Sequence, residues 1–177
     1  MQVILGASLM PRLRTLLIPF SALIAASPFL LSCQVASPFK GPGYTRGKGV
    51  TLPDATDTVW VGLTNAQLDG SNRATFDDYT RRVIRDLPNR DGYVGHSVRT
   101  RVFGNEVWTM TIWRDEAALN AFVRAPVHRE AMREGIGAVT TARFARFAWP
   151  ASQVPPSWDE AKRRLSEVEP VTYGAAP

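Results

Sequence analysis

The feature that most constrains the fold of this chain is the order of two periodicities between residues 59 and 149. In four segments apolar residues alternate with polar ones, as they do in half-buried strands. Between these segments apolar residues recur at spacings of three and four, which predicts amphipathic helices. The predicted order is therefore β-α-β-β-α-β. The four predicted strands span residues 59–64, 94–102, 107–113 and 143–149.

Both predicted helices have recognisable ends. Ser71 or Thr75 caps the first, which stops before Pro88. Asp115 caps the second, and Pro126 interrupts it before a further stretch of helix. The apolar face of the first helix carries Phe76, Tyr79, Val83 and Leu87, and that of the second carries Ala118, Leu119, Phe122 and Val123.

This order is the split βαβ arrangement of an α+β, ferredoxin-like fold, a four-stranded antiparallel sheet with both helices on one face. The other face would then be bare. We expect Trp60, Trp113 and either Phe147 or Trp149 to lie on it, with Trp108 turned toward the helices. A surface as apolar as this is not stable in water. Packing against the same face of a second copy is the simplest way to cover it. The sequence therefore predicts a homodimer, a dimeric α+β barrel that encloses a cavity.

The composition excludes several classes of site. Among 177 residues there are one Cys and two His, too few for an internal disulfide or for a metal centre built from Cys and His. We therefore expect no metal. The excess of 21 basic over 16 acidic residues is mild, and we expect no nucleic-acid partner.

The amino-terminal segment has the layout of an export signal. Arg12 and Arg14 precede an uncharged, largely apolar stretch that runs from residue 15 to residue 31. A transmembrane anchor is the competing interpretation, but Pro19 and Pro28 interrupt the stretch. It is also short for the ~20 apolar residues that cross a bilayer. Met10 begins a complete signal by itself, so we expect translation to start there.

The end of this stretch, Leu30-Leu31-Ser32-Cys33, resembles the lipobox of bacterial lipoproteins. The resemblance implies cleavage before Cys33, acylation of that residue, and a lipid-anchored protein on the periplasmic side of the envelope. Gln34 follows in place of the Asp that commonly retains such proteins in the inner membrane, so the expectation extends to the outer membrane. The alternative is an ordinary signal peptide that contains an unmodified cysteine.

Four segments follow from these patterns. They are a signal peptide at 1–32, a flexible Gly- and Pro-rich tether at 33–58, the βαββαβ domain at 59–149, and a carboxy-terminal helix with a tail at 150–177.

One stretch of the domain carries a more specific pattern. A strand ends in Trp113, an acidic cap opens an Ala-, Leu- and Phe-rich helix, and Ala125-Pro126-Val127-His128 leads into more helix. This pattern resembles the dimeric α+β barrel domains of the antibiotic-biosynthesis-monooxygenase type. The specific motif covers some 25 residues, from Trp108 to Met132, and the coarse likeness covers 59–149.

The resemblance implies oxygenation of a small phenol or quinol without metal or organic cofactor. Such chemistry needs a base that titrates near neutrality and groups that hold an anion. We expect His128 to be the base and Asn65 to orient the anion. The expected substrate-binding residues are Trp60, Trp113, Phe122 and His96, although the alternation of the second strand turns His96 toward the helices.

Alternatives remain for each of these residues and for the function. His128 could cap a helix, His96 and Asn65 could be structural, and the tryptophans could be core or interface. The haem-degrading relatives carry a Trp and a His at the places of Phe122 and Met132, so haem is disfavoured. The scarcity of titratable groups also fits a non-catalytic module that binds small ligands or assembles with other proteins.

Overall fold

A computed structural model describes residues 33–173 of the chain. The expectations for the signal peptide and for Met10 lie outside these residues. No helix within 33–173 is both long and apolar enough to cross a membrane. The helices are α1 (Arg73–Asp86), α2 (Glu116–Val123), α3 (Pro126–Gly135) and α4 (Trp158–Ser166). The strands are β1 (Gln34–Ala36), β2 (Tyr44–Thr45), β3 (Gly49–Val50), β4 (Thr58–Leu68), β5 (Tyr93–Arg101), β6 (Glu106–Trp113), β7 (Val139–Pro150) and β8 (Val171–Thr172).

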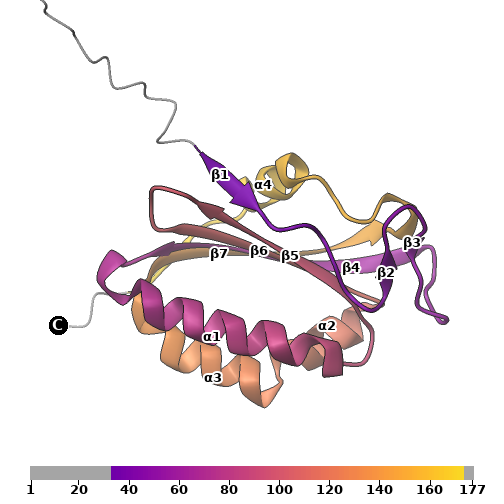
Figure 1. Ribbon diagram of the computed structural model, residues 1–177, viewed down its shortest axis with the longest axis horizontal. Helices are drawn as coiled ribbons and strands as arrows, with labels where there is room; N and C mark the ends of the chain where they lie inside the picture. Colours follow the sequence, from indigo (N-terminus) through magenta and orange to yellow (C-terminus); the bar gives the residue numbers. More distant parts are fainter. Residues whose placement is uncertain (1–32, 174–177) are drawn as a thin grey trace, which may run out of the picture.

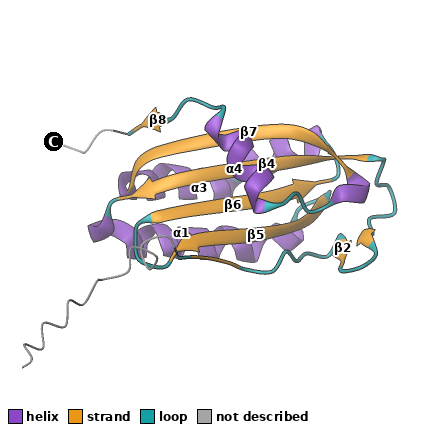
Figure 2. Cartoon of the chain, turned by 90° about the horizontal axis from the view of Figure 1, so that it is seen from above, coloured by secondary structure: helices purple, strands orange, loops and turns teal. Residues whose placement is uncertain are grey.

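The central sheet has the order β1-β5-β6-β4-β7-β8, and all of its neighbouring strands are antiparallel. The four long strands β5, β6, β4 and β7 have the ferredoxin-like order, which confirms the predicted α+β fold. Helices α1, α2 and α3 lie on one face of the sheet, and α4 lies on the other (Figure 1). Seen from above, α4 crosses over the strands (Figure 2).

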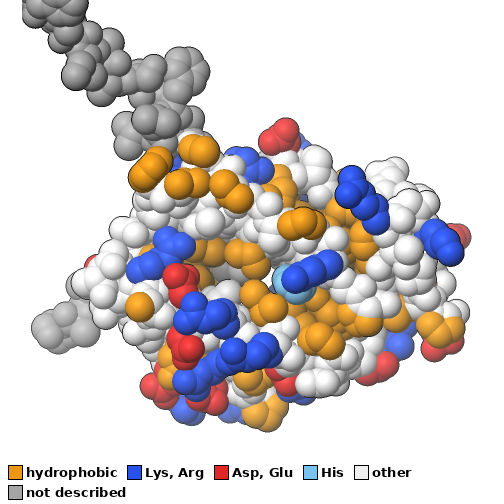
Figure 3. All heavy atoms as spheres, in the orientation of Figure 1, with side chains coloured by type: hydrophobic (Ala, Val, Ile, Leu, Met, Phe, Trp, Pro, Cys, Tyr) orange, Lys and Arg blue, Asp and Glu red, His pale blue; other side chains and the backbone are white. Residues whose placement is uncertain are grey.

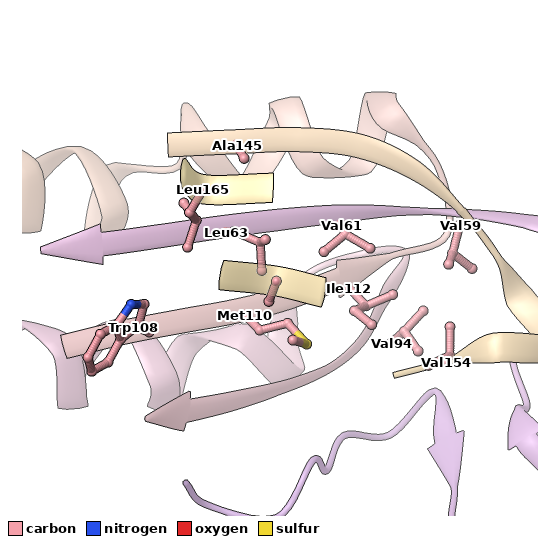
Figure 4. Packing of buried hydrophobic residues seen from close by; sticks show 11 residues of the cluster. Val59, Val61, Leu63, Val94, Trp108, Met110, Ile112, Ala145, Val154 and Leu165 are labelled. Carbon is pink, nitrogen blue, oxygen red and sulfur yellow. The ribbon is translucent and has the colours of Figure 1, made fainter. Parts of the chain in front are cut away.

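The sheet face that we expected to be bare is covered by the chain itself. Ala161 and Leu165 of α4 are buried against it, at 0% and 3% exposure. Phe39 and Leu52, from the segment before β4, pack on the same cluster. Figure 4 shows the side chains of this core between the sheet and its cover. The premise of the predicted homodimer, an uncovered apolar surface, is therefore wrong. The buried members of the cluster are Val59, Val61, Leu63, Val94, Trp108, Met110, Ile112, Ala145, Val154, Ala161 and Leu165.

The assignment of Trp60, Trp113 and Trp108 to the two faces is also wrong, whereas Trp149 lies on the expected face. Trp113 pairs with Trp60 across β6 and β4, and both belong to the cluster beneath α2. Trp108 instead faces α4, and Lys162 lies 5.5 Å from the centre of its ring. Trp149 pairs with Val59 and shares that face. Because helices cover both faces of the sheet, the residues that face either side of a strand are largely apolar. The sequence pattern alone therefore does not show which face a given residue occupies.

Residues 33–58 do not form the expected free tether. Strand β1 pairs with the edge of β5, and β2 and β3 form a short hairpin further along. The Gly43 amide donates to the carbonyl of Val94 at 3.1 Å. A Cβ on Gly41 would lie 2.3 Å from the Cα of Gly95, so only glycine allows the two backbones to approach so closely. This segment is therefore part of the domain.

Asp115 caps α2 as predicted, since its carboxylate accepts from the Ala118 amide at 2.7 Å. Replacing Asp115 with Ala is expected to lower the free energy of unfolding by about 1 kcal/mol, because the amide loses its acceptor. Urea unfolding measures the change, and Glu116→Ala, an exposed neighbour in the first turn, is the control. Equal effects from the two substitutions would contradict the role of the cap.

Candidate functional site

A cavity of about 750 Å³ lies between the sheet and the helices α1, α2 and α3. Phe76, Tyr79 and Val83 of α1 line it, and no residue of α1 is fully buried, because the helix stands over this space. Figure 3 shows hydrophobic side chains gathered on the face where the molecule is hollowed. A concave, mostly apolar space with a few polar groups is the usual form of a small-molecule site.

The sheet contributes a row of hydroxyl groups to the cavity. Thr64 of β4 pairs with Thr109 of β6, and Thr111 lies two residues further along β6. All three are half-buried and line the cavity. A hydroxyl group both donates and accepts a hydrogen bond, so the hydroxyls of Thr64 and Thr109 can hold a polar edge of a ligand in either protonation state. The hydroxyl of Thr111 already donates to the carbonyl of Gly62 at 3.4 Å.

His128 enters the site from α3. Its Nδ1 lies 3.1 Å from the carbonyl oxygen of Val123, at the end of α2. A carbonyl only accepts, so Nδ1 carries the proton and Nε2 keeps its lone pair for a ligand. Burial lowers the pKa of His128, the bond to Val123 opposes this shift, and the charge of Arg146 lowers the pKa further. His128 is therefore a neutral imidazole with a basic nitrogen at neutral pH.

His96 enters the site from β5 and is 8% exposed. Its Nδ1 lies 2.5 Å from the hydroxyl of the buried Tyr93. Burial raises the pKa of Tyr93, so the hydroxyl keeps its proton, and donating it to Nδ1 is the arrangement that leaves no buried proton unpaired. Nε2 of His96 then carries the N–H. Burial and the charge of Lys40 lower the pKa of His96, so this ring is also neutral.

A row of aromatic rings links the two histidines. Tyr93 contacts Trp113 at 5.4 Å between ring centroids, and Trp113 stacks on Phe122 at 4.7 Å. Phe122 in turn lies 4.5 Å from the His128 ring. The indole N–H of Trp113 donates to the hydroxyl of Thr111 at 3.0 Å. Packed aromatic rings have few rotamer alternatives, so this row fixes the positions of both imidazoles.

Basic side chains lie at the rim of the cavity. Arg129 and Arg133 come from α3, and Arg146 comes from β7. Arg133 pairs with Glu134 at 2.6 Å, and Arg146 donates to the side-chain oxygen of Asn120 at 3.3 Å. Their positive charge favours a ligand that is anionic or becomes anionic when bound.

The structure brings some of the predicted site residues together and separates others. His128, His96 and Phe122 line the cavity. Trp113 is fully buried behind Phe122, and the half-buried Trp60 packs in the same cluster, so neither is on the cavity wall. Asn65 points to the opposite face, where its amide donates to Glu106 at 3.1 Å, and it takes no part in this site.

The positions that the haem-degrading relatives use do not fit a haem group here. Phe122 carries no ligand atom, and Met132, which is 38% exposed, offers only a thioether at the rim. No cluster of three or more His, Cys, Asp or Glu side chains that could hold a metal ion occurs within residues 33–173.

Sequence reasoning missed Tyr93 and the row of threonines. Tyr93 stands three residues before His96, and a β-bulge between Tyr93 and Gly95 allows both side chains to face the helices. No local pattern reveals such a bulge. The alternation of Thr109, Thr111 and Trp113 is visible in the sequence, but the expectation places it on the wrong face.

The two histidines predict a specific pH dependence of stability. Both have a pKa lowered by burial in the folded state, so below the ordinary value of 6.5 the unfolded chain binds more protons. The free energy of unfolding is therefore expected to fall as the pH drops from 7 to 5.5. Asp115 keeps its charge through this range because its pKa is lowered by the Ala118 amide.

Urea unfolding at the two pH values measures this effect. In His96→Gln the difference between pH 7 and pH 5.5 should shrink, because one group that titrates differently in the two states is gone. An unchanged difference in both His96→Gln and His128→Gln would show that the histidines are not its source.

Comparison with known proteins gives one family and several structures. Residues 64–134 match the family model described as antibiotic biosynthesis monooxygenase. This match includes α1, β5, β6, α2 and most of α3, and it therefore carries both histidines of the cavity. Among curated proteins, none matches the chain.

Three solved structures are similar to part of this chain. A proposed antibiotic biosynthesis monooxygenase from Nitrosomonas europaea is 8% identical, with a TM-score of 0.49 over 56% of this chain and 94% of that one. SnoaB, a cofactor-independent oxygenase from Streptomyces nogalater, is 19% identical, with a TM-score of 0.45 over 58% and 100%. A Lactobacillus acidophilus protein is 17% identical, with a TM-score of 0.45 over 53% of this chain. This chain spans 44% of the Lactobacillus protein.

The element order, the strand pairing and the matched segment agree with one another. The chain therefore has an α+β, ferredoxin-like fold, and its residues 64–134 are similar to the antibiotic biosynthesis monooxygenase family.

Proposed function

We propose that the chain is a cofactor-independent monooxygenase that acts on a small phenol or quinol in the cavity under α1. One observation carries the proposal. Two neutral imidazoles face the same apolar space with opposite hydrogen-bonding character, since Nε2 of His128 accepts and Nε2 of His96 donates. A proton abstraction that creates an anion needs this pair of roles.

In the proposed reaction Nε2 of His128 takes the proton of the phenolic hydroxyl. The oxyanion that forms accepts hydrogen bonds from Nε2–H of His96 and from a threonine hydroxyl of the sheet. The apolar wall of α1 excludes water, which strengthens these bonds. The arginines at the rim favour the negative charge.

The deprotonated ring supplies all the electrons that dioxygen needs. Its electron-rich carbon transfers one electron to O₂, and the two radicals combine to form a carbon–oxygen bond and a hydroperoxide. Loss of water then breaks the O–O bond and leaves a quinone carbonyl. The balance is C₆H₆O + O₂ → C₆H₄O₂ + H₂O for a simple phenol, so no external reductant is required. The two hydrogens of the water are the phenolic proton and the hydrogen of the reacting carbon.

Oxygen uptake by the full chain with a panel of phenols, quinols and anthrols tests the proposal. Uptake should be stoichiometric with quinone formation, and Val83→Phe, which fills the cavity from α1, should abolish it. The alternative, a module that binds but does not transform small ligands, predicts saturable quenching of tryptophan fluorescence by these compounds without oxygen uptake. Binding without oxygen uptake would contradict the proposed monooxygenase activity.

We also propose that the protein is lipid-anchored in the envelope through Cys33. The exposure of Cys33 and its free sulfur support this, because an acylated residue has to be accessible. Mass spectrometry of the protein purified from membranes should show a mature chain that begins at an acylated Cys33. An unmodified cysteine preceded by Ser32 would contradict the anchor.

A further inference from the structure

We propose that the edge formed by β1 and the β5–β6 turn is a membrane-contacting surface that seats the domain on an anionic lipid bilayer. Val35, Val102 and Phe103 form its apolar part and are 55%, 45% and 60% exposed. Within residues 33–173 they are three of only five large hydrophobic side chains with such exposure. The inference takes from the proposed function only that the amino-terminal segment reaches a membrane.

These three side chains lie together although two segments supply them. Val35 pairs with Thr100 in the register of β1 and β5. The Val102 amide donates to the carbonyl of Cys33 at 2.9 Å, which places the turn beside the start of the described chain. Figure 3 shows hydrophobic side chains gathered where the grey amino-terminal segment joins the molecule. The patch, which we call the edge patch, thus lies beside the predicted site of attachment.

The chain at this edge is held firmly against the domain. The side-chain oxygen of Gln34 accepts from Nε of Arg99 at 2.9 Å and from Nζ of Lys162 at 2.6 Å. In the sequence the apolar stretch 15–31 ends two residues before Cys33. Two residues span at most about 7 Å, so a membrane that holds this stretch, or the acylated cysteine, lies directly against the edge patch.

The charges beside the patch suit anionic lipid headgroups. Arg99 and Lys162 have no carboxylate within salt-bridge distance in the described part of the chain. Arg101 pairs with Glu106 at 2.9 Å and Arg73 with Asp77 at 3.2 Å. Basic side chains near anionic lipids contribute about 1 kcal/mol each. Three apolar side chains and two cations without a carboxylate partner within residues 33–173 bind weakly alone, and they orient a domain that a separate anchor already holds at the surface.

Site-specific labelling of the full chain tests this surface. Cys33 is the only cysteine, so Cys33→Ser gives a background in which Phe103→Cys carries a single environment-sensitive fluorophore. In this background the uncleaved apolar stretch 15–31 serves as the separate anchor. The matched control is Lys48→Cys in the exposed β2–β3 turn, at the other end of the sheet (Figure 1). Both chains are reconstituted into vesicles of phosphatidylethanolamine and phosphatidylglycerol.

The label at position 103 should emit at shorter wavelength and be quenched by lipids that carry a nitroxide, and the label at position 48 should do neither. A label at Val35→Cys should repeat the result for 103. Aqueous emission at 103 and 35 in chains that float with the vesicles would overturn the proposal. So would failure of the chain to float, or vesicle-independent disulfide formation between two copies of the unlabelled Phe103→Cys chain. None of these readouts depends on oxygen uptake, so the two proposals fail separately.

Discussion

His128→Gln is expected to lower kcat for oxygen uptake by about 10²- to 10⁴-fold, the usual contribution of a general base. Glutamine can still donate an amide N–H to the Val123 carbonyl, so the end of α2 keeps its partner. It carries no basic nitrogen, so the cavity loses the group that takes the phenolic proton. Oxygen-electrode traces and thermal unfolding curves of the two proteins measure the loss and check the fold.

The matched variant is His96→Gln, which removes the donor and leaves the base. Its rate should also fall, by about 10²- to 10³-fold as for other oxyanion donors. The pH profile separates the roles. In the wild type and in His96→Gln, kcat should fall at low pH because His128 takes up a proton. The fall should occur below pH 6.5, because burial lowers the pKa of His128. In His128→Gln this limb should be absent. Equal uptake by wild type and His128→Gln would remove His128 from the mechanism.

Trp113→Ala is expected to lower the free energy of unfolding by about 3–5 kcal/mol, the usual cost of removing a large buried aromatic ring. Trp113 is 0% exposed and packs between Tyr93 and Phe122. Its loss leaves a cavity behind the wall of the site and the Thr111 hydroxyl without its donor. Because Trp113 supports the rings beside both histidines, oxygen uptake should be lost at temperatures where the variant is still folded.

Trp60→Ala is the control for this substitution. Trp60 pairs with Trp113 across the sheet and is only half-buried, so its truncation should cost less. Urea unfolding at pH 7 gives both free energies. A loss below about 1 kcal/mol for Trp113→Ala would contradict the central position of this ring in the core.

The helices and the four long strands could be predicted because each of them carries its own local signal. Asp115 caps α2 and Pro126 starts α3, as the sequence indicated. The predicted cap of the first helix is wrong, because α1 begins after Asn72 and neither Ser71 nor Thr75 caps it. These signals depend on residues within one turn of each other. The order βαββαβ then leaves few ways to arrange the sheet, and the ferredoxin-like one is observed.

The faces of the sheet could not be predicted because they depend on residues far away in the sequence. Trp108 and Trp113 both lie in apolar environments, one beneath α4 and the other beneath α2. The cover of the second face comes from residues 39–52 and from α4, which flank the domain on both sides in the sequence. Gly- and Pro-rich composition predicts a tether for the first of these segments, and tertiary packing overrides it.

The candidate site could be predicted in part. His128 is identified from its turn, and it lines the cavity. His96 was expected both to bind substrate and to be turned toward the helices, and it lines a cavity on that side. The cavity itself was expected on the other face of the sheet. Asn65 follows the same alternation as Leu63 and therefore lies on the face away from the cavity. A single error in the assignment of faces explains both outcomes.

The second layer supplied by α4 and the segment before β4 has a thermodynamic consequence. Within residues 33–173 the groups that shield this side of the β-structure belong to the same polypeptide as the sheet, so this concealment is a unimolecular event. Dilution therefore does not expose it, and a melting temperature governed by this layer is independent of protein concentration. Such a protein is expected to stay folded at low concentrations, at which a sheet covered by a partner subunit would lose its cover by dissociation.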